Sequence, residues 1–286
     1  MSRANRPEGS ITRGTTNPNR LRRFDRWIIH RLGRQIRDER APVVVDLGFG
    51  ASPVTTLELA QRMAQRVGPG ITVVGVEIDA SRVELARQLE QGFPGGVRFL
   101  RGGFEIPLPG GERPLLVRAC NVLRQYPVQD VPRAWAIVAG RLAPGGLLVD
   151  GTSDELGRLC AWVSIPCPDG ASQGEFGVVP DEFTISVDLR TLDRPSRVAE
   201  RLPKALIHRN VPGEPVHALL VDLDRAWDRA AALAAFGPRQ RWVAAVRDLR
   251  DRGLPVRAGP QRWRLGELTV PWSTVAPIEP DQLASR

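Results

Sequence analysis

Acidic, small and aromatic residues gather after four apolar runs in the first half of the sequence. They lie at 46–52 (DLGFGAS), 77–79 (EID), 102–105 (GGFE) and 121–126 (NVLRQY). Glycines allow a backbone to approach a ligand closely. A carboxylate that follows a strand can accept hydrogen bonds from ribose hydroxyls. These residue types indicate a binding site for a nucleoside-like ligand.

The first glycine loop does not fit either common phosphate-binding motif. A dinucleotide fingerprint needs G-x-G-x-x-G, but Pro53 stands where the third glycine belongs, and a P-loop needs a Gly-Lys pair that is absent. Asp46, two residues before Gly48, would repel a pyrophosphate and suits a ligand with an ammonium group. An acid that ends a buried strand is costly unless it has a partner. We therefore expect Asp46 to face a positively charged ligand.

An alternation of strands and helices positions these loops. Continuous apolar runs predict buried parallel strands at 43–47, 71–77, 97–101, 115–120 and 146–150, with helices at 53–67, 81–91 and 131–142 between them. In an open sheet of this kind, ligands bind beyond the carboxyl ends of the strands. The candidate residues follow those ends.

The rest of the chain divides around this core. Residues 1–16 are predicted to be a disordered tail, and residues 17–41 a basic amphipathic helix that begins at Asn17-Pro18. The sheet domain is expected over 42–190, closed by an antiparallel pair at 160–165 and 182–189. Residues 191–286 are predicted to be a largely helical region, packed on the same domain and covering the substrate, with a last strand at 262–270.

The ordered set of motifs resembles the class I S-adenosylmethionine (SAM)-dependent methyltransferases over about residues 42–152. The matching segments are VVVDLGFGAS, VVGVEIDASRVELAR and ACNVLRQYPVQDVPRAWAIVAGRLAPGGLLVDGT. The resemblance implies an α/β fold with a doubly wound, mostly parallel seven-stranded sheet of Rossmann-like type. It also implies SAM as the cofactor and S-adenosylhomocysteine (SAH) as its product.

The resemblance assigns a role to each loop. Glu77 would hold the ribose hydroxyls, Ile78 would pack on the adenine, and Asn121 would lie beneath the cofactor near the methyl group. The remaining cofactor-binding candidates are Asp46, Gly48, Gly50 and Ser52 around the methionine part, and Phe104 and Glu105 by the adenine edge. Ser52 replaces a glycine that is common in the family, and Gly-Gly-Phe-Glu replaces its usual Gly-Asp.

Candidates for a catalytic base are few. Methyl transfer from a sulfonium is an in-line displacement that positioning accelerates, and only a neutral hydroxyl acceptor strongly needs a base. Tyr126 is the sole tyrosine, Glu155 follows the fifth strand, and His208 lies in the region expected to cover the pocket. Each also has an ordinary explanation, as a core-packing or exposed residue. No spaced set of His, Asp and Glu predicts a metal site.

Composition and charge suit a cytoplasmic protein, with no signal peptide and no membrane-spanning run. The net charge is +8, yet Lys204 is the only lysine. Such an arginine bias is typical of a GC-rich coding genome, and we expect a bacterial source. The three cysteines contain no C-x-x-C pair, which disfavours structural zinc.

Three functions remain open. The first is methyl transfer to a small-molecule or sugar-like acceptor. The second is an RNA methyltransferase whose arginine-rich N-terminal helix contacts phosphates, and the third is a SAM-binding protein without catalysis. Neither the acceptor atom nor the oligomeric state follows from the sequence.

Overall fold

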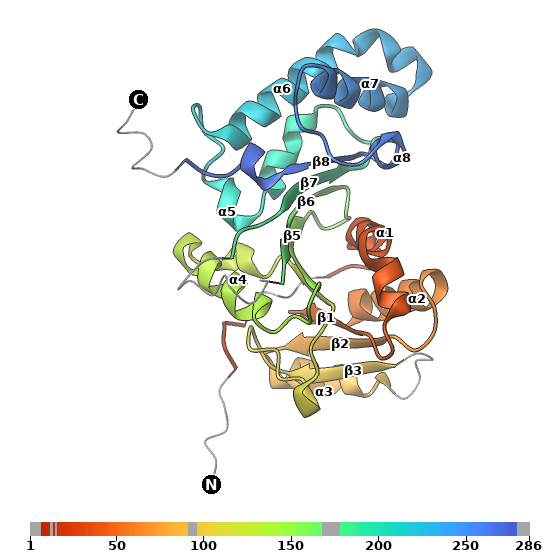
Figure 1. Ribbon diagram of the computed structural model, residues 1–286, viewed down its shortest axis with the longest axis vertical. Helices are drawn as coiled ribbons and strands as arrows, with labels where there is room; N and C mark the ends of the chain where they lie inside the picture. Colours follow the sequence, from red (N-terminus) through yellow and green to blue (C-terminus); the bar gives the residue numbers. More distant parts are fainter. Residues whose placement is uncertain (1–6, 12–13, 15, 91–95, 168–177, 279–286) are drawn as a thin grey trace. The chain divides into compact units, whose positions relative to one another are not determined.

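The chain forms two compact units, and the computed structural model describes residues 7–11, 14, 16–90, 96–167 and 178–278 (Figure 1). Unit 1 comprises Met1–Asp150, Glu155–Gly157 and Ile165–Val179, and unit 2 comprises Gly151–Asp154, Arg158–Ser164 and Pro180–Arg286. The sequence prediction placed a boundary at residue 190 instead. The later strands pair with one another, so they group with the C-terminal helices.

Unit 1 is a parallel α/β sheet whose strands follow the order β3-β2-β1-β4-β5. Val45 of β1 pairs with Val74 of β2 on one side and with Val117 of β4 on the other. The elements are α1 Arg22–Asp38, β1 Val43–Leu47, α2 Val54–Arg66, β2 Thr72–Glu77, α3 Ala80–Arg87, β3 Val97–Arg101, β4 Leu116–Cys120, α4 Val131–Ala139 and β5 Leu147–Ser153.

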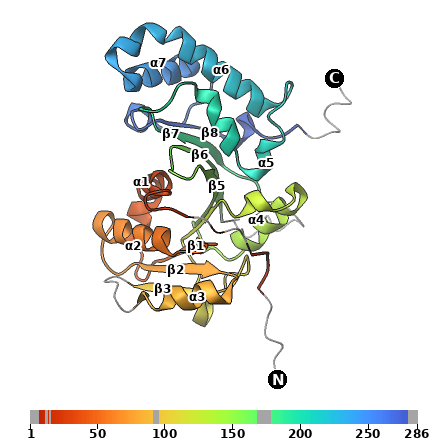
Figure 2. The same cartoon turned by 180° about the vertical axis from the view of Figure 1, so that it is seen from behind.

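The sheet of unit 1 is apolar because helices cover it. Every residue of β1 and β5 is buried, as expected for parallel strands between helical layers. Helix α2 turns Leu59, Ala60 and Met63 to the core, and α1 lies beside α2 in both views (Figures 1 and 2). The five strands that the sequence predicted here are present, and parallel pairing joins β1 with β2, β1 with β4 and β2 with β3.

Helix α1 begins later than predicted. Asn17 to Arg20 form a turn in which the Arg20 N–H donates to the Asn17 carbonyl, and Asn19 has a φ of 62°. That left-handed conformation is incompatible with a continuous helix, so α1 begins at Arg22 with Leu21 as its N-cap. The predicted apolar face is buried.

Unit 2 contains antiparallel strands and most of the later helices. In the sheet order, β6, β7 and β8 follow β5, whose last residues belong to this unit, and β7 pairs antiparallel with both β6 and β8. The further elements are β6 Leu159–Pro166, β7 Glu182–Val187, α5 Lys204–Ile207, α6 Pro215–Arg229, α7 Pro238–Asp251, α8 Pro260–Trp263 and β8 Glu267–Pro271. The antiparallel pair β6–β7 confirms its prediction.

The described residues contain eight strands, each near a position predicted for a strand, whereas the family resemblance implied a seven-stranded sheet. The fold is nonetheless mixed α/β with a mostly parallel core, as the sequence indicated. No helix within the described ranges combines the length and hydropathy needed to cross a membrane.

Candidate functional site

A narrow slot lies where β1, β2, β3 and β4 end in unit 1. It is lined by Glu8, Ser10, Leu47, Gly48, Glu77, Ile78, Gly102, Gly103, Phe104, Val122 and Tyr126. The enclosed space that remains in the slot measures about 20 Å³. A cavity of this size holds about one water molecule. The loops that the sequence singled out therefore converge, but the space between them is nearly full.

The glycine loop after β1 adopts a conformation that side chains rarely reach. Gly48 has a φ of 70° and Gly50 a φ of 83°. A Cβ on Gly48 would lie 2.7 Å from Val122 Cγ2, and one on Gly50 would lie 2.7 Å from the carbonyl oxygen of Gly14. Both glycines are required by the backbone and by the close approach of neighbouring chain segments.

Glu77 ends β2 with its carboxylate directed at backbone N–H groups. Its Oε2 accepts from the Gly50 N–H at 3.0 Å, and its Oε1 accepts from the N–H groups of Ile78 at 2.9 Å and Asp79 at 3.2 Å. Arg82 adds an ion pair at 3.8 Å. The carboxylate thus fixes the glycine loop against the end of β2, and Glu77 is among the residues that line the slot.

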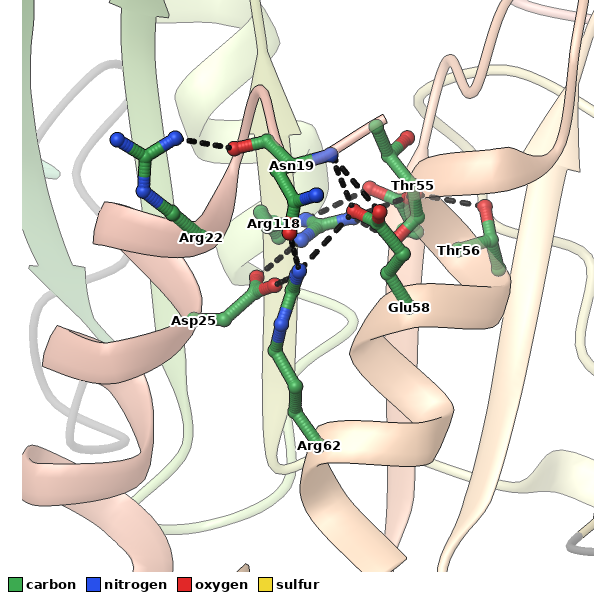
Figure 3. Close-up of polar contacts among 9 residues, drawn as sticks. Asn19, Arg22, Asp25, Thr55, Thr56, Glu58, Arg62 and Arg118 are labelled. Atoms are coloured by element: carbon green, nitrogen blue, oxygen red, sulfur yellow. Dashed lines mark hydrogen bonds and ion pairs between the residues drawn. The ribbon is translucent and has the colours of Figure 1, made fainter. Parts of the chain in front are cut away.

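Asp46 is engaged by a buried cation of the protein itself, the guanidinium of Arg118, which Figure 3 shows together with Asp25. Arg118, the residue opposite Asp46 on β4, donates from Nε to Oδ1 at 2.9 Å and pairs with Oδ2 at 2.7 Å. The Thr56 hydroxyl donates to Oδ2 at 2.7 Å. The predicted positive partner is therefore present, but it is an arginine side chain, and Asp46 does not line the slot.

The same arginine joins α1 to the sheet. Arg118 also pairs with Asp25 of α1 and donates to the Thr55 carbonyl at 3.0 Å. Arg62 of α2 pairs with Asp25 from the other side. Burial acts to lower the pKa of Arg118, but the Asp46 and Asp25 carboxylates outweigh it and raise that pKa. Arg118 therefore stays charged in the core.

Phe104 and Glu105 present a donor beside an acceptor at the slot. The Phe104 N–H donates to the Glu8 carbonyl at 2.9 Å, and Glu105 Oε2 accepts from the Glu8 N–H at 2.8 Å. Glu105 Oε1 accepts from the Gly103 N–H at 2.9 Å, which holds the carboxylate in place. The pair is preorganised by its own loop.

Tyr126 closes another wall of the slot. Its ring lies 5.2 Å from that of Phe104, and its hydroxyl accepts from the Ser10 N–H at 2.6 Å and donates to the Ser10 carbonyl at 3.2 Å. Burial raises the pKa of Tyr126. A phenol with a raised pKa stays protonated at neutral pH and cannot accept a proton there, so its placement favours packing and hydrogen bonding.

Two further cofactor candidates lie near the ends of their strands. Asn121 directly follows β4 and has a φ of 62°, a conformation in which Asn is enriched. Ser52 precedes α2, and its Oγ accepts from the Val54 N–H at 3.4 Å. The N-cap of α2 is Pro53, so this bond of Ser52 belongs to the turn before the helix.

The other catalytic candidates do not line the slot. Glu155 is exposed, and its backbone carbonyl accepts from the Asn17 side chain at 3.1 Å. His208 is exposed at the end of α5 in unit 2. Across the described part of the chain, no group of three His, Cys, Asp or Glu side chains could hold a metal ion.

Sequence reasoning missed two features of this region. One is Arg118, a single charge within the apolar run LVRAC, and such a residue signals a buried acid opposite it. The other is the segment from Pro7 to Ile11 together with Gly14. It was predicted to belong to a disordered tail, but it hydrogen bonds across the slot. Its polar composition gave no signal of that docking.

Comparisons with known proteins give structural matches only. No family model matches the chain, and no curated protein matches it. Magnesium protoporphyrin IX methyltransferase from Synechocystis PCC 6803 with bound SAH is 19% identical, with a TM-score of 0.35 over 46% of this chain and 53% of that one. The N-methyltransferase NodS from Bradyrhizobium japonicum WM9 is 17% identical, with a TM-score of 0.34 over 47% and 63%.

The [4+2]-cyclase SpnF also matches, at 19% identity and a TM-score of 0.34 over 50% of this chain and 52% of that one. The chain thus covers between about half and two thirds of these structures. Similarity at this level concerns the fold alone, and one of these proteins is a cyclase. Unit 1 itself is an α/β sheet with the strand order β3-β2-β1-β4-β5.

Proposed function

We propose that this chain binds SAM in the slot of unit 1 and transfers its methyl group to a small-molecule acceptor. The observation that carries the proposal is the pair formed by the Phe104 N–H and the Glu105 carboxylate. The Watson–Crick edge of adenine offers an amino donor beside a ring-nitrogen acceptor, which this pair complements. Ile78 and Phe104 supply apolar walls for a flat base.

Glu77 suits the ribose in this proposal. A carboxylate has about four lone-pair positions, and backbone N–H groups take three of them. The remaining position on Oε2 can accept a ribose hydroxyl. Asp46 has a supporting role here, because its oxygens hold Arg118 and Thr56. Gly48 would lie beside the methionine part, since its backbone forms the slot wall nearest β1.

The acceptor would enter from the side of α4. An open hollow of about 260 Å³ lies there, bounded by Phe104, Tyr126, Asp130 and Arg133 among others. When bound, SAM supplies a methyl group on a sulfonium sulfur that is open to in-line displacement. Tyr126 and Arg133 would orient the acceptor, so positioning supplies the rate. Neither Glu155 nor His208 is needed as a base in this proposal.

Binding measurements test the cofactor. Isothermal titration calorimetry should detect SAH and SAM binding to the full chain, and Glu105→Gln should weaken both roughly tenfold, because it removes a charged acceptor. Glu84→Gln on α3, where the Glu84 side chain is 71% exposed, is the matched control and should leave affinity unchanged. Because Glu105 also accepts from the Glu8 N–H, the comparison is repeated in a Glu8→Pro background, which lacks that bond. Equal affinities of the two substitutions there would contradict the adenine assignment.

Turnover separates this proposal from its alternatives. The full chain incubated with labelled SAM and cell extract should yield a labelled small molecule. A SAM-binding protein without catalysis would yield none. The RNA alternative loses two of its arginines, because Arg20 and Arg23 of the N-terminal region are only 8% and 6% exposed, while Arg31 and Arg34 are exposed. Arg23 also donates to the Gly157 carbonyl at 2.9 Å. Arg20 and Arg23 are therefore withdrawn from any phosphate-facing surface.

A further inference from the structure

A short N-terminal segment lies across the slot. We call Pro7 to Ile11 and Gly14 the strap; its first part is the dark red stretch below α4 in Figure 1. The loop after β3 holds the strap at Glu8, and Tyr126 holds it at Ser10. The glycine loop holds it at Gly14, whose carbonyl accepts from the Ala51 N–H at 2.9 Å. The strap therefore contacts three of the loops that form the site.

The strap satisfies the groups assigned above to adenine. The Glu8 N–H donates to the Glu105 carboxylate, and the Glu8 carbonyl accepts from the Phe104 N–H. One residue thus offers a donor and an acceptor side by side, as the Watson–Crick edge of adenine does. The backbone of Glu8 imitates the hydrogen bonds expected of the base.

Gly9 occupies the space between the walls of the slot. A Cβ built on Gly9 would lie 2.7 Å from the Tyr126 hydroxyl, 2.9 Å from Ile78 Cδ1 and 3.6 Å from Phe104 Cε2. These are the side chains expected to enclose the base. A glycine is needed there because no larger residue fits, and its φ of 129° also favours glycine.

The strap also divides a larger depression. The slot, the hollow beside α4 and a third hollow beside the start of α3 each include strap residues in their walls: Glu8 and Ser10, Glu8 and Gly9, and Pro7, Gly9, Ser10 and Ile11. Without the strap these spaces would join. Ligand pockets commonly measure about 300–1,000 Å³, far above the 20 Å³ left in the slot.

The strap is attached weakly enough to leave. Glu8, Gly9, Ser10 and Ile11 are all exposed, so the strap lies at the surface and its release moves no buried element of the fold. Its hydrogen bonds are few, and each exchange with water changes stability only modestly. A ligand that makes the same bonds and adds stacking contacts can replace it.

We infer that the strap is an internal competitor of SAM, occupying the adenine part of the site until the cofactor displaces it. The inference rests on the proposed function. A lid would lie over a space that remains open beneath it, whereas the strap fills the space and uses the recognition groups. Closure by the strap therefore lowers the apparent affinity by the fraction of open chains.

Two full-length variants should open the site. Glu8→Pro removes the N–H that donates to Glu105, and Gly9→Val introduces a side chain against Tyr126 and Ile78. Glu8→Ala is the matched control because it keeps the backbone N–H. By calorimetry we expect both opening variants to bind SAH and adenosine at least about fivefold more tightly than the wild type, and Glu8→Ala to bind as the wild type does.

Tyr126 reports on the strap without any ligand. It is the sole tyrosine, so ultraviolet titration of its phenol follows one group. Burial raises the pKa of Tyr126 by more than its hydrogen bonds to Ser10 lower it. Release of the strap removes both influences, so both opening variants should bring the pKa nearer the ordinary value of about 10. A Tyr126 pKa unchanged from the wild type in both variants would show that the strap does not cover the site, and would overturn the inference.

The binding outcomes separate the two proposals. Unchanged or weaker SAH binding in the opening variants, with a lowered Tyr126 pKa, overturns competition and leaves the proposed function intact. Absence of SAM, SAH and adenosine binding in every variant, opened ones included, overturns the proposed function itself. Tighter binding in both opening variants alone supports the competitor.

Discussion

Two buried acids of unit 1 are stabilised in different ways. Asp46 on β1 and Asp150 on β5 are each 2% exposed. Asp46 accepts hydrogen bonds from the Arg118 guanidinium and the Thr56 hydroxyl. Asp150 accepts from the indole N–H of Trp135 at 2.9 Å. Burial raises the pKa of Asp150 to about 7. One site holds an internal cation, and the other holds a proton.

This difference limits what a buried acid reveals about ligands. The sequence argument held that an acid ending a buried strand needs a positively charged ligand. In this chain Arg118 on the neighbouring strand meets the need of Asp46, and a neutral carboxyl group meets that of Asp150. An acid after an apolar run therefore indicates a partner, without telling whether that partner is a ligand, a side chain or a proton.

The sharpest way to break the comparison is Arg118→Met. Methionine fits an apolar core, but its introduction leaves Asp25 and Asp46 without their shared cation. Removal of one partner from a buried ion pair costs about 3–5 kcal/mol, and we expect the free energy of unfolding in urea to fall by that amount. Arg34→Met, at a side chain that is 94% exposed, should change it little.

A loss below about 1 kcal/mol for Arg118→Met would mean that the buried charges contribute no more than a neutral hydrogen bond. The two acids would then be equivalent, and the comparison would fail.

Asp150→Asn tests the other site. The ordinary pKa of 3.8 is raised to about 7 in the folded chain, so between these values the unfolded chain loses a proton that the folded chain keeps. The free energy of unfolding then falls as pH rises, by roughly 1.4 kcal/mol per pH unit at most. Above about pH 7 the Asp150 contribution is constant.

The Asn variant lacks this contribution. The difference between wild-type and variant stabilities should therefore change from about pH 4 to 7 in favour of the variant, as measured by urea unfolding at fixed pH values. Parallel pH profiles would show that Asp150 is ionised in the folded chain, which would contradict its assignment as a proton-holding site.

Thr56→Val should give the smallest effect. It removes the hydroxyl that donates to Asp46 and keeps the shape of the side chain. We expect a loss of roughly 1.5 kcal/mol in unfolding free energy, because hydrogen bonds to charged groups exceed neutral ones. Thr184→Val, which breaks the neutral bond between Thr184 and Thr269 in unit 2, is the reference. A larger loss in Thr184→Val would contradict the charged state of Asp46.

The sequence predicted the parallel core well because its signals are local. Continuous apolar runs such as VVVDL mark strands buried on both faces, and the conformations of Gly48 and Gly50 follow from the loop that joins β1 to α2. The acids and aromatic residues at the strand ends were found for the same reason. Glu77, Phe104 and Tyr126 line the slot, and their roles toward a cofactor stay predictions.

The features that were missed depend on contacts between distant residues. Arg118 of β4 pairs with Asp46 on the neighbouring strand β1 and with Asp25 on α1. The network therefore needs β1, β4 and α1 to be in place together. The strap has no periodic pattern, and its bonds use backbone atoms whose positions no side-chain type encodes. In unit 2 the last strand, β8, begins later than the predicted strand at 262–270, because the helix α8 occupies Pro260–Trp263.

The division of the chain into units bears on how it is synthesised. The chain changes unit after residues 150, 154, 157, 164 and 179, and β5 itself contains the first change. Neither unit is therefore one continuous stretch that could be expressed alone. During translation domains generally fold as they emerge, the N-terminal one first. Here the first unit is complete only when Val179 has left the ribosome. Part of the second unit is therefore synthesised before the last residues of the first.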